Sequence, residues 1–145
     1  QERFPDIRTC FAHGGQLAQM NLGRRIQGFD GRPDLFEGKV HPRKAVGHPN
    51  IYFDTLVHDT DSFKLMVDRQ GSKQILMGLD DPYPLGEMES APQSSYPGKL
   101  LDLAMERNII GQEQYDDIWD DNVLRWLFGE DEAAKKNLVR KILGE

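Results

Sequence analysis

The sequence predicts an α/β fold in which three parallel strands are joined by crossover helices. Three short runs rich in apolar, β-branched or aromatic residues, at 7–15, 51–59 and 73–78, are typical of strands. The connections between them are too long for hairpins, and they contain residues at helical spacing. The predicted order is therefore strand, helix, strand, helix, strand, followed by further helices.

The first strand is expected to end at Gly14 and Gly15, and residues 16–29 have helical spacing. Prolines and glycines in residues 30–50 indicate a long loop with at most one helical turn. Thr60 or Asp61 is expected to cap a helix that ends at Gly71. The later segments divide into a loop at 90–98 and helices at 99–108, 111–121, 122–130 and 131–144.

Composition excludes several classes of protein. The 145 residues suit one domain, and 38% hydrophobic with 29% charged residues is a globular composition. A net charge of −6 argues against nucleic-acid binding, and no apolar run could cross a membrane. Without a signal peptide, and with Cys10 as the single cysteine, a cytoplasmic protein is expected. Cys10 lies in an apolar stretch, which favours a buried, inert thiol over a nucleophile.

Three parallel strands make a poor domain by themselves. Such sheets are covered on both faces and paired at their edges, and here at least one edge would be bare. The chain also begins with Gln1 rather than Met, in a segment that reads as the end of a helix. We therefore expect an arc of something larger, with either processing or an absent N-terminal part.

Polar side chains follow all three predicted strands. They are His13 after the first, His58 with Asp59 after the second, and Asp80 with Asp81 after the third. Strand ends are where reactive groups gather in parallel α/β folds, and histidine beside carboxylate suits a divalent metal or acid–base chemistry. The alternatives remain that His13 is a turn residue and that the aspartates only cap helices or form turns.

Other candidates have simpler interpretations. His41 and His48 each precede a proline in a loop and are expected at the surface, and Arg24 with Arg25 fits a solvated helix face. The large aromatic residues of the last helices are expected to pack those helices together: Trp119, Trp126 and Phe128. Composition and spacing alone thus predict a site at the strand ends and leave its chemistry open.

Three stretches carry a resemblance: "CFAHGGQLAQMNLGRRIQGFDGRPDL", "YFDTLVHDTDSFKLMVDRQG" and "ILMGLDDPYPLGE". They resemble the C-terminal part of the amidohydrolase-related, metal-dependent decarboxylases over residues 3–88, with a fainter echo at "IWDDNVLRWLFG". The resemblance implies an arc of a TIM (β/α)₈ barrel, about strands six to eight with their helices. Residues 1–129 would form this arc, and 130–145 an amphipathic helical tail.

The resemblance also implies roles for individual residues. His13 would be the acid–base histidine, and Asp80 would bind zinc or another divalent metal with its water. Arg24 would hold a substrate carboxylate in the neighbouring subunit of a homodimer, and Tyr83 would lie near the substrate. The implied reaction removes CO₂ from an unsaturated amino-carboxylic acid, as in tryptophan catabolism.

The sequence departs from the family pattern in two ways. The ligand histidines expected on barrel strands one and five have no counterpart here, and Leu79 and Asp81 replace a small hydroxyl residue and a tyrosine. Two alternatives therefore remain. One is a metal-dependent hydrolase on the same barrel, and the other is an inactive barrel fragment that acts as an interaction subunit.

Overall fold

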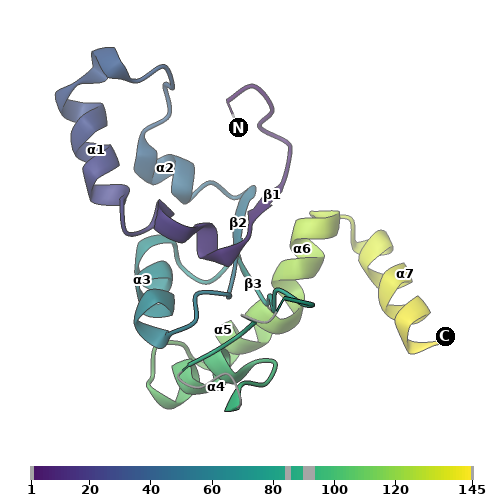
Figure 1. Cartoon of the computed structure of the whole chain (residues 1–145). Helices are drawn as coiled ribbons and strands as arrows, with labels where there is room; N and C mark the ends of the chain where they lie inside the picture. Colours follow the sequence, from purple (N-terminus) through teal and green to yellow (C-terminus); the bar gives the residue numbers. More distant parts are fainter. Residues whose placement is uncertain (1, 84–85, 90–93, 145) are drawn as a thin grey trace.

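A three-stranded parallel sheet lies at the centre of the molecule (Figure 1). The structure is a computed structural model that describes residues 2–83, 86–89 and 94–144. The strands lie in chain order, and their bounds are β1 (Thr9–Phe11), β2 (Ile51–Asp54) and β3 (Ile75–Leu76). Both pairs are parallel, with Thr9 opposite Ile51 and Phe53 opposite Ile75. The predicted parallel α/β arrangement is confirmed.

The strands are shorter than the sequence indicated. β2 ends at Asp54, so His58 and Asp59 lie in the following loop rather than at the strand end. The Asp54 side chain explains the early end, because its Oδ1 accepts a hydrogen bond from the backbone N–H of Leu56 at 3.1 Å. An aspartate that binds its own backbone two residues on turns the chain away from the sheet.

The helix predicted over 16–29 begins later than expected. His13–Ala18 forms a 3₁₀ segment, η1, in which Gly14, Gly15 and Gln16 have left-handed backbone angles. Such angles interrupt a right-handed helix, so α1 begins only at Leu22 and runs to Gly31. Leu17 and Met20, two of the residues at helical spacing in 16–29, are 59% and 70% exposed.

The long connection before β2 contains more regular structure than one turn. A short 3₁₀ helix, η2, spans Pro33–Leu35, and α2 spans Pro42–Val46. Proline at the first position of each suits a helix start, since its missing N–H would have no partner there. Val46, the last residue of α2, is buried in the core.

The helix α3 (Thr60–Gln70) was predicted correctly except for its cap. Asp59 is the capping residue, and its Oδ1 accepts the backbone N–H of Ser62 at 2.7 Å. Thr60, which was one of the two expected caps, is instead buried inside the first turn. Gly71 ends the helix with a φ of 77°, as the sequence predicted.

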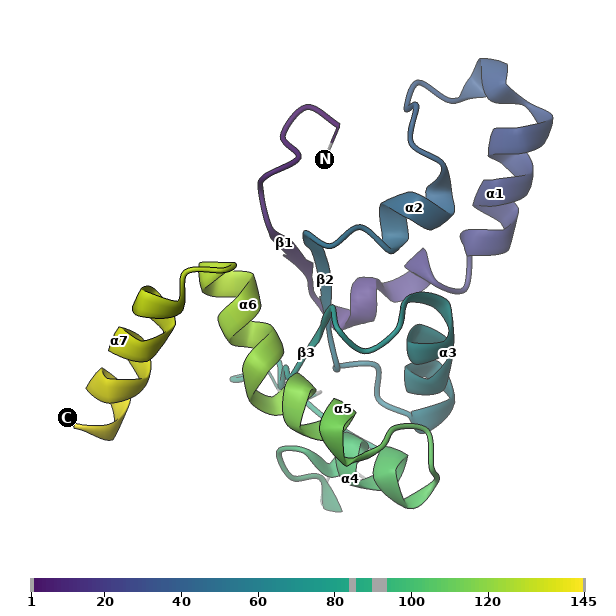
Figure 2. The ribbon, with the colours of Figure 1, turned by 180° about the vertical axis from the view of Figure 1, so that it is seen from behind.

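Helical segments dominate the described residues after β3 (Figure 2). Their bounds are α4 (Lys99–Glu106), α5 (Gln112–Asp116), the π-helical η4 (Asp117–Asp121), α6 (Asn122–Phe128) and α7 (Glu132–Leu143). Asn122 fixes α6 against the sheet, because its side-chain amide donates to the carbonyls of Ser72 and Ile75 at 2.9 and 2.8 Å. The helix α7 lies beyond α6, away from the sheet, and none of its residues is buried.

The hydrophobic core lies between the sheet and helices α1 to α4. Phe53 and Ile75 enter it from neighbouring strands and meet Leu22, Phe63 and Met66 from the helices. Leu100, Leu101 and Ile118 extend the core under the C-terminal helices. Among the described residues, no helix has the length and apolar content needed to cross a membrane.

Candidate active site at the strand ends

The structure brings two of the predicted site residues together. His13 follows β1 and Asp80 follows β3, and the His13 Nε2 lies 3.4 Å from the Asp80 Oδ1. A carboxylate only accepts, so the ring donates its Nε2–H in a long hydrogen bond. The two side chains are 41% and 24% exposed, which leaves both open to a ligand. Because parallel strands end at one edge of a sheet, residues 67 positions apart meet there.

The backbone at this edge is strained. His13, His58 and Asp80 have φ values of 55°, 69° and 63°, in the left-handed region that L-residues with a side chain rarely adopt. Each such residue costs about 1–3 kcal/mol, and the surrounding structure must hold it there. Strained residues of this kind gather at functional sites. Three of the five residues that the sequence placed after the strands are thus distinguished by their backbone as well as by their chemistry.

Asp54 joins the two halves of the site, although its place in the sequence did not predict this role. Its Oδ1 accepts the backbone N–H of Gly14 at 2.9 Å, next to His13. On its other side a Cβ at Gly78 would lie 2.7 Å from the Cβ of Asp54, so only glycine fits there, two residues before Asp80. The one signal for Asp54 was a lone acid in the aromatic run "IYFDT".

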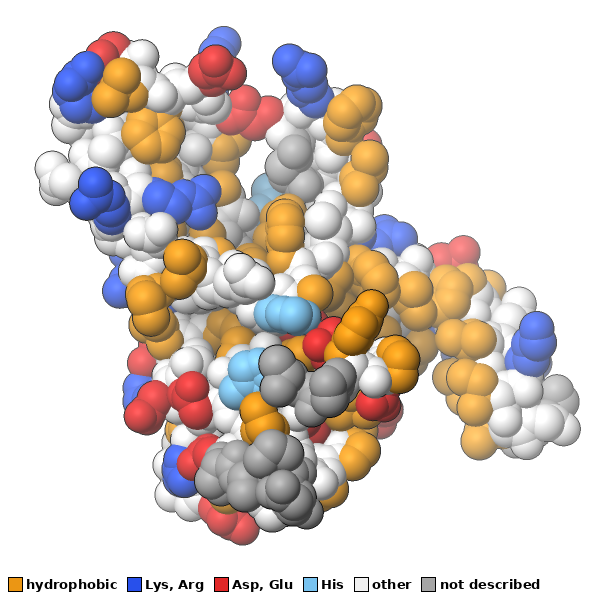
Figure 3. Space-filling model, in the orientation of Figure 1, with side chains coloured by type: hydrophobic (Ala, Val, Ile, Leu, Met, Phe, Trp, Pro, Cys, Tyr) orange, Lys and Arg blue, Asp and Glu red, His pale blue; other side chains and the backbone are white. Residues whose placement is uncertain are grey.

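His58 and His13 line the same cavity, of about 370 Å³. Figure 3 shows histidine side chains gathered near the centre of this face of the molecule. Apolar walls and neutral polar groups complete the lining, which is made by Gln16, Leu17, Leu56, Val57 and Ser62. Asp59 does not contribute, because its carboxylate caps α3. The cavity is large enough for a small organic acid.

Tyr83 lies close to the site in the chain but lines a different hollow. Its backbone N–H donates to the carbonyl of Asp80 at 2.8 Å, while its side chain is 67% exposed. The hollow it lines, of about 200 Å³, also contains Asp81 and Glu87. Pro84 and Leu85, which complete the predicted turn, lie outside the described residues.

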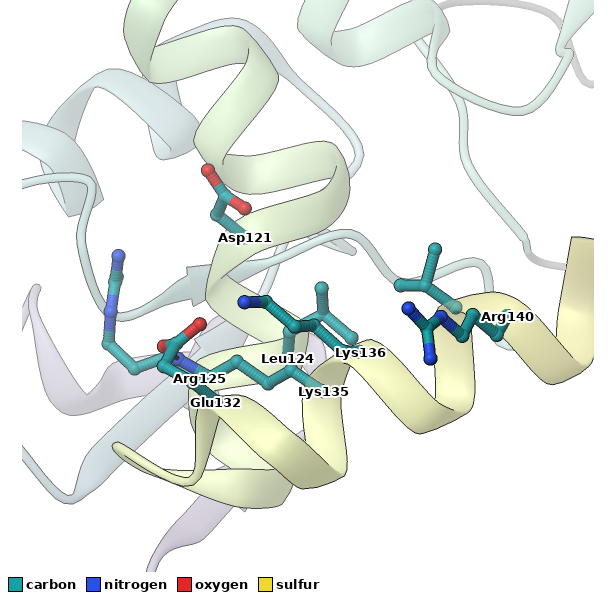
Figure 4. Close-up of a pocket in the computed structure, with 8 residues that line it drawn as sticks. Asp121, Leu124, Arg125, Glu132, Lys135, Lys136 and Arg140 are labelled. Carbon is teal, nitrogen blue, oxygen red and sulfur yellow. Dashed lines mark hydrogen bonds and ion pairs between the residues drawn. The ribbon is translucent and has the colours of Figure 1, made fainter.

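Arg24 lies away from the His13 cavity. It is exposed on α1 and lines a hollow with Gln27, Gly28, Gly31 and Arg32. Another hollow, of about 480 Å³, separates α6 from α7 (Figure 4). Basic side chains from both helices, Arg125, Lys135, Lys136 and Arg140, line that hollow with Asp121 and Glu132. Neither hollow contains a residue that the sequence placed at the strand ends.

The remaining sequence candidates have structural roles. His41 and His48 are half-buried rather than freely exposed, because each Nδ1 accepts a backbone N–H, from Arg43 at 3.3 Å and from Asn50 at 3.1 Å. Trp119 packs against the core as expected, and the Cβ-free Gly98 makes room for its ring. Trp126 and Phe128 are half-buried on α6.

Cys10 fits the interpretation as an inert thiol. Burial, together with the nearby Asp54 charge, raises the pKa of Cys10 from 9.0 to about 11. A thiol with so high a pKa remains protonated near neutral pH, and only the thiolate is a good nucleophile. Cys10 therefore takes no part in the candidate site.

The described residues do not by themselves fit a zinc site. Zinc in proteins takes three or four protein ligands. Within the part of the chain that the structure describes, no three His, Cys, Asp or Glu side chains converge in a way that could hold a metal ion. His13 and Asp80 form a pair, and that pair can orient a ring or move a proton.

Comparison with known proteins identifies proteins that are similar to this chain in sequence. No protein-family model matches the chain. The 2-amino-3-carboxymuconate-6-semialdehyde decarboxylase of Dictyostelium discoideum is 36% identical over 107 residues, which cover 72% of this chain and 27% of that protein. The chain is a relative of the 2-amino-3-carboxymuconate-6-semialdehyde decarboxylases. The protein of that name from Caenorhabditis elegans is 42% identical over 88 residues, or 59% of this chain and 21% of that protein.

Solved structures of two further decarboxylases share the fold. The chain matches the apo form of IDCase from Metarhizium anisopliae with a TM-score of 0.65 and 18% identity, over 90% of this chain and 36% of that one. It matches the 5-carboxyvanillate decarboxylase of Sphingomonas paucimobilis with a TM-score of 0.64 and 16% identity, over 86% and 35%. The chain thus spans about a quarter of its curated decarboxylase relatives and about a third of these structures.

Proposed function

We propose that this chain is the C-terminal arc of a (β/α)₈ barrel decarboxylase, about strands six to eight, and that His13 is its proton donor. The observation that supports the proposal most strongly is the His13–Asp80 pair at the carboxyl edge of the parallel sheet. Relatives named as 2-amino-3-carboxymuconate-6-semialdehyde decarboxylases suggest the substrate class, an unsaturated amino-carboxylic acid.

The open sides of the molecule support an arc. Among the described residues, β1 and β3 each pair on one side only, with β2. Phe4 and Ile7, which precede β1, and Phe11, which ends it, are 63%, 55% and 47% exposed. Exposed apolar surface of this kind marks contact surfaces when it is contiguous. Three of eight barrel repeats would also account for the 36% and 35% of the two solved decarboxylases that the chain covers.

The chemistry proposed for His13 is proton transfer. When the bond to the departing CO₂ breaks, its electron pair remains on carbon and spreads into the unsaturated system. That carbon then takes a proton, which a positioned histidine can supply. Asp80 accepts one N–H of the ring and fixes its orientation. In the imidazolium form, the ring can give the proton on its other nitrogen to the carbon and return to the neutral form.

A divalent metal, in this proposal, needs ligands from beyond the described residues. Asp80 would contribute one carboxylate, and a zinc ion there would supply Lewis-acid chemistry. The proposal also includes a homodimer in which Arg24 holds a substrate carboxylate in the neighbouring subunit. Arg24 is exposed on α1 and is therefore available for such a contact.

A second candidate function follows from the incomplete donor set. A chain that supplies only a His–Asp pair would not bind metal by itself, and its unpaired strand edges could complete another chain's barrel. In that case the chain is an interaction subunit and the activity belongs to the assembly.

The test is CO₂ release by the full-length protein from 2-amino-3-carboxymuconate 6-semialdehyde. We expect turnover in the unaltered protein and a loss of at least about a hundredfold in His13→Ala, the size typical of a general acid. His41→Ala is the matched control, since His41 caps α2 and lies outside the cavity, and it should retain activity.

Metal content measured on the same samples separates the roles. His13→Ala should keep its bound metal, whereas Asp80→Ala should lose both metal and turnover. Full metal and full activity in Asp80→Ala would show that the assignment of Asp80 is wrong. Undiminished CO₂ release in His13→Ala would refute the proposed proton donor.

A further inference from the structure

His58 lines the same cavity as His13, and the proposed function gives it no role. It lies four residues beyond β2, with a left-handed φ of 69°, and its ring lines the 370 Å³ cavity beside His13. A histidine that only filled space could adopt any orientation that packs well. The two nitrogens of this ring, however, have different surroundings.

The buried nitrogen of His58 determines where the ring carries its proton. Nδ1 is fully enclosed and has no hydrogen-bond partner among the described residues, whereas Nδ1 of His41 and of His48 each accepts a backbone N–H. A neutral imidazole has one N–H, and an enclosed N–H without an acceptor is costly. The proton therefore belongs on Nε2, which is not enclosed and which has no bond within the described part of the chain.

We propose that His58 is a substrate-binding residue, which donates its Nε2–H to a carboxylate oxygen of a planar, unsaturated acid held in the cavity. The proposal rests on the proposed function for the place of the reaction and adds the group that holds the substrate there. His58 and His13 would then contact the same molecule, one as an anchor and the other as proton donor.

The lining of the cavity favours such a ligand. Leu17, Leu56 and Val57 provide apolar walls for a flat carbon skeleton, and no residue of the lining is an aspartate, glutamate, lysine or arginine. Neutral hydrogen-bond donors are left to orient a carboxylate. Ser62 is already engaged with Asp59, to whose Oδ2 its hydroxyl donates at 3.0 Å. Gln16 also carries an amide donor, but its side chain is exposed, whereas the His58 ring is half-buried with Nδ1 enclosed. The free Nε2–H of His58 is therefore the better oriented anchor.

A rival explanation is that His58 serves only to allow the left-handed backbone at this position, and two substitutions distinguish this from a donor role. Asparagine tolerates a positive φ well, but its short amide ends near the Nδ1 position. Glutamine can place an amide N–H near the Nε2 position, although it tolerates this φ less well. A donor role therefore predicts that His58→Gln binds better than His58→Asn, and a purely conformational role predicts the reverse order.

The experiment measures binding of benzene-1,3-dicarboxylate, a planar acid that cannot be turned over, to the full-length protein by calorimetry. We expect Kd to rise about tenfold to a hundredfold in His58→Asn, as for the loss of one hydrogen bond to a charged group, and less in His58→Gln. His48→Asn is the control, because His48 lies outside the cavity, and its Kd should be unchanged.

Two results would overturn the proposal: binding by His58→Asn that equals or exceeds that of His58→Gln, or no binding by the unaltered protein. CO₂ release by the unaltered protein distinguishes this failure from failure of the proposed function. If the unaltered protein releases CO₂ but the Kd for benzene-1,3-dicarboxylate does not depend on His58, only the role of His58 as anchor is refuted. Binding that depends on His58 without CO₂ release would support the anchor and refute the decarboxylase.

Discussion

At the scale of single residues, Asp54 connects the loops that form the site. Its carboxylate accepts the N–H groups of Gly14 and Leu56, and its Cβ lies against Gly78. Gly14 follows His13 directly, and Gly78 precedes Asp80 by two residues. One half-buried acid thus holds the loops that carry both members of the His13–Asp80 pair.

Replacing Asp54 should disturb both stability and the site. Asp54→Ala leaves two N–H groups without their acceptor, so we expect a loss of about 1–3 kcal/mol in the free energy of unfolding and reduced turnover. Asp54→Asn keeps an acceptor oxygen, so its free energy of unfolding should lie between those of the unaltered protein and of Asp54→Ala. Urea unfolding of the full-length variants checks this, and wild-type stability in Asp54→Ala would contradict it.

The Cys10 thiol gives a pH prediction for the same neighbourhood. Its pKa is raised by burial and by Asp54, so folding favours the protonated thiol. Stability from this thiol is fully present below pH 9.0 and is lost as pH rises through about 11. Native Cys10 should react with iodoacetamide about a hundredfold more slowly at pH 8 than in the unfolded chain. Equal rates in the two states would contradict the burial of this thiol.

At the scale of elements, a residue far from α4 in the chain caps that helix. Glu87 is 4% exposed, and its two carboxylate oxygens accept the N–H groups of Gly98 at 2.6 Å and Leu100 at 2.9 Å. Gly98 itself has no side chain to cap the helix. The carboxylate therefore replaces the usual capping residue, and burial raises its pKa above the ordinary value.

The sign of the pH effect follows from this raised pKa. Folding favours protonated Glu87, so its contribution is fully present below the unfolded pKa and is lost as pH rises through the higher folded value. Relative to Glu87→Gln, the unaltered protein should become less stable between pH 4 and pH 7. Thermal unfolding at both pH values measures this. Glu106→Gln, at an exposed position on α4, is the control and should show no such shift.

The element scale also shows what the sequence could predict. The His13–Asp80 pair was predictable, because residues that follow parallel strands meet at one edge. Asp54 was not, since a lone acid inside an aromatic run looks like part of the strand. The start of α1 was misplaced because the left-handed Gly14, Gly15 and Gln16 leave no mark on hydrophobic spacing. The Glu87 cap depends on a contact eleven residues away in the chain, which no local pattern encodes.

At the scale of the whole molecule, three observations indicate that the sheet and the site are incomplete within the described part of the chain. β1 and β3 have one partner each among the described residues, and three apolar residues in β1 and in the segment before it are exposed. The His–Asp pair lacks further metal ligands within the described part of the chain. Each of these is accounted for if further barrel strands continue the sheet on both sides.

The most direct test of this central claim is the intact mass of the native protein from its source cells, measured on material captured with an antibody against α7. If these residues are an arc of a decarboxylase barrel, we expect a polypeptide of more than twice the 16.6 kDa of this chain. A native mass of 16.6 kDa would contradict the claim, and the activity would then have to be sought in a complex with another chain.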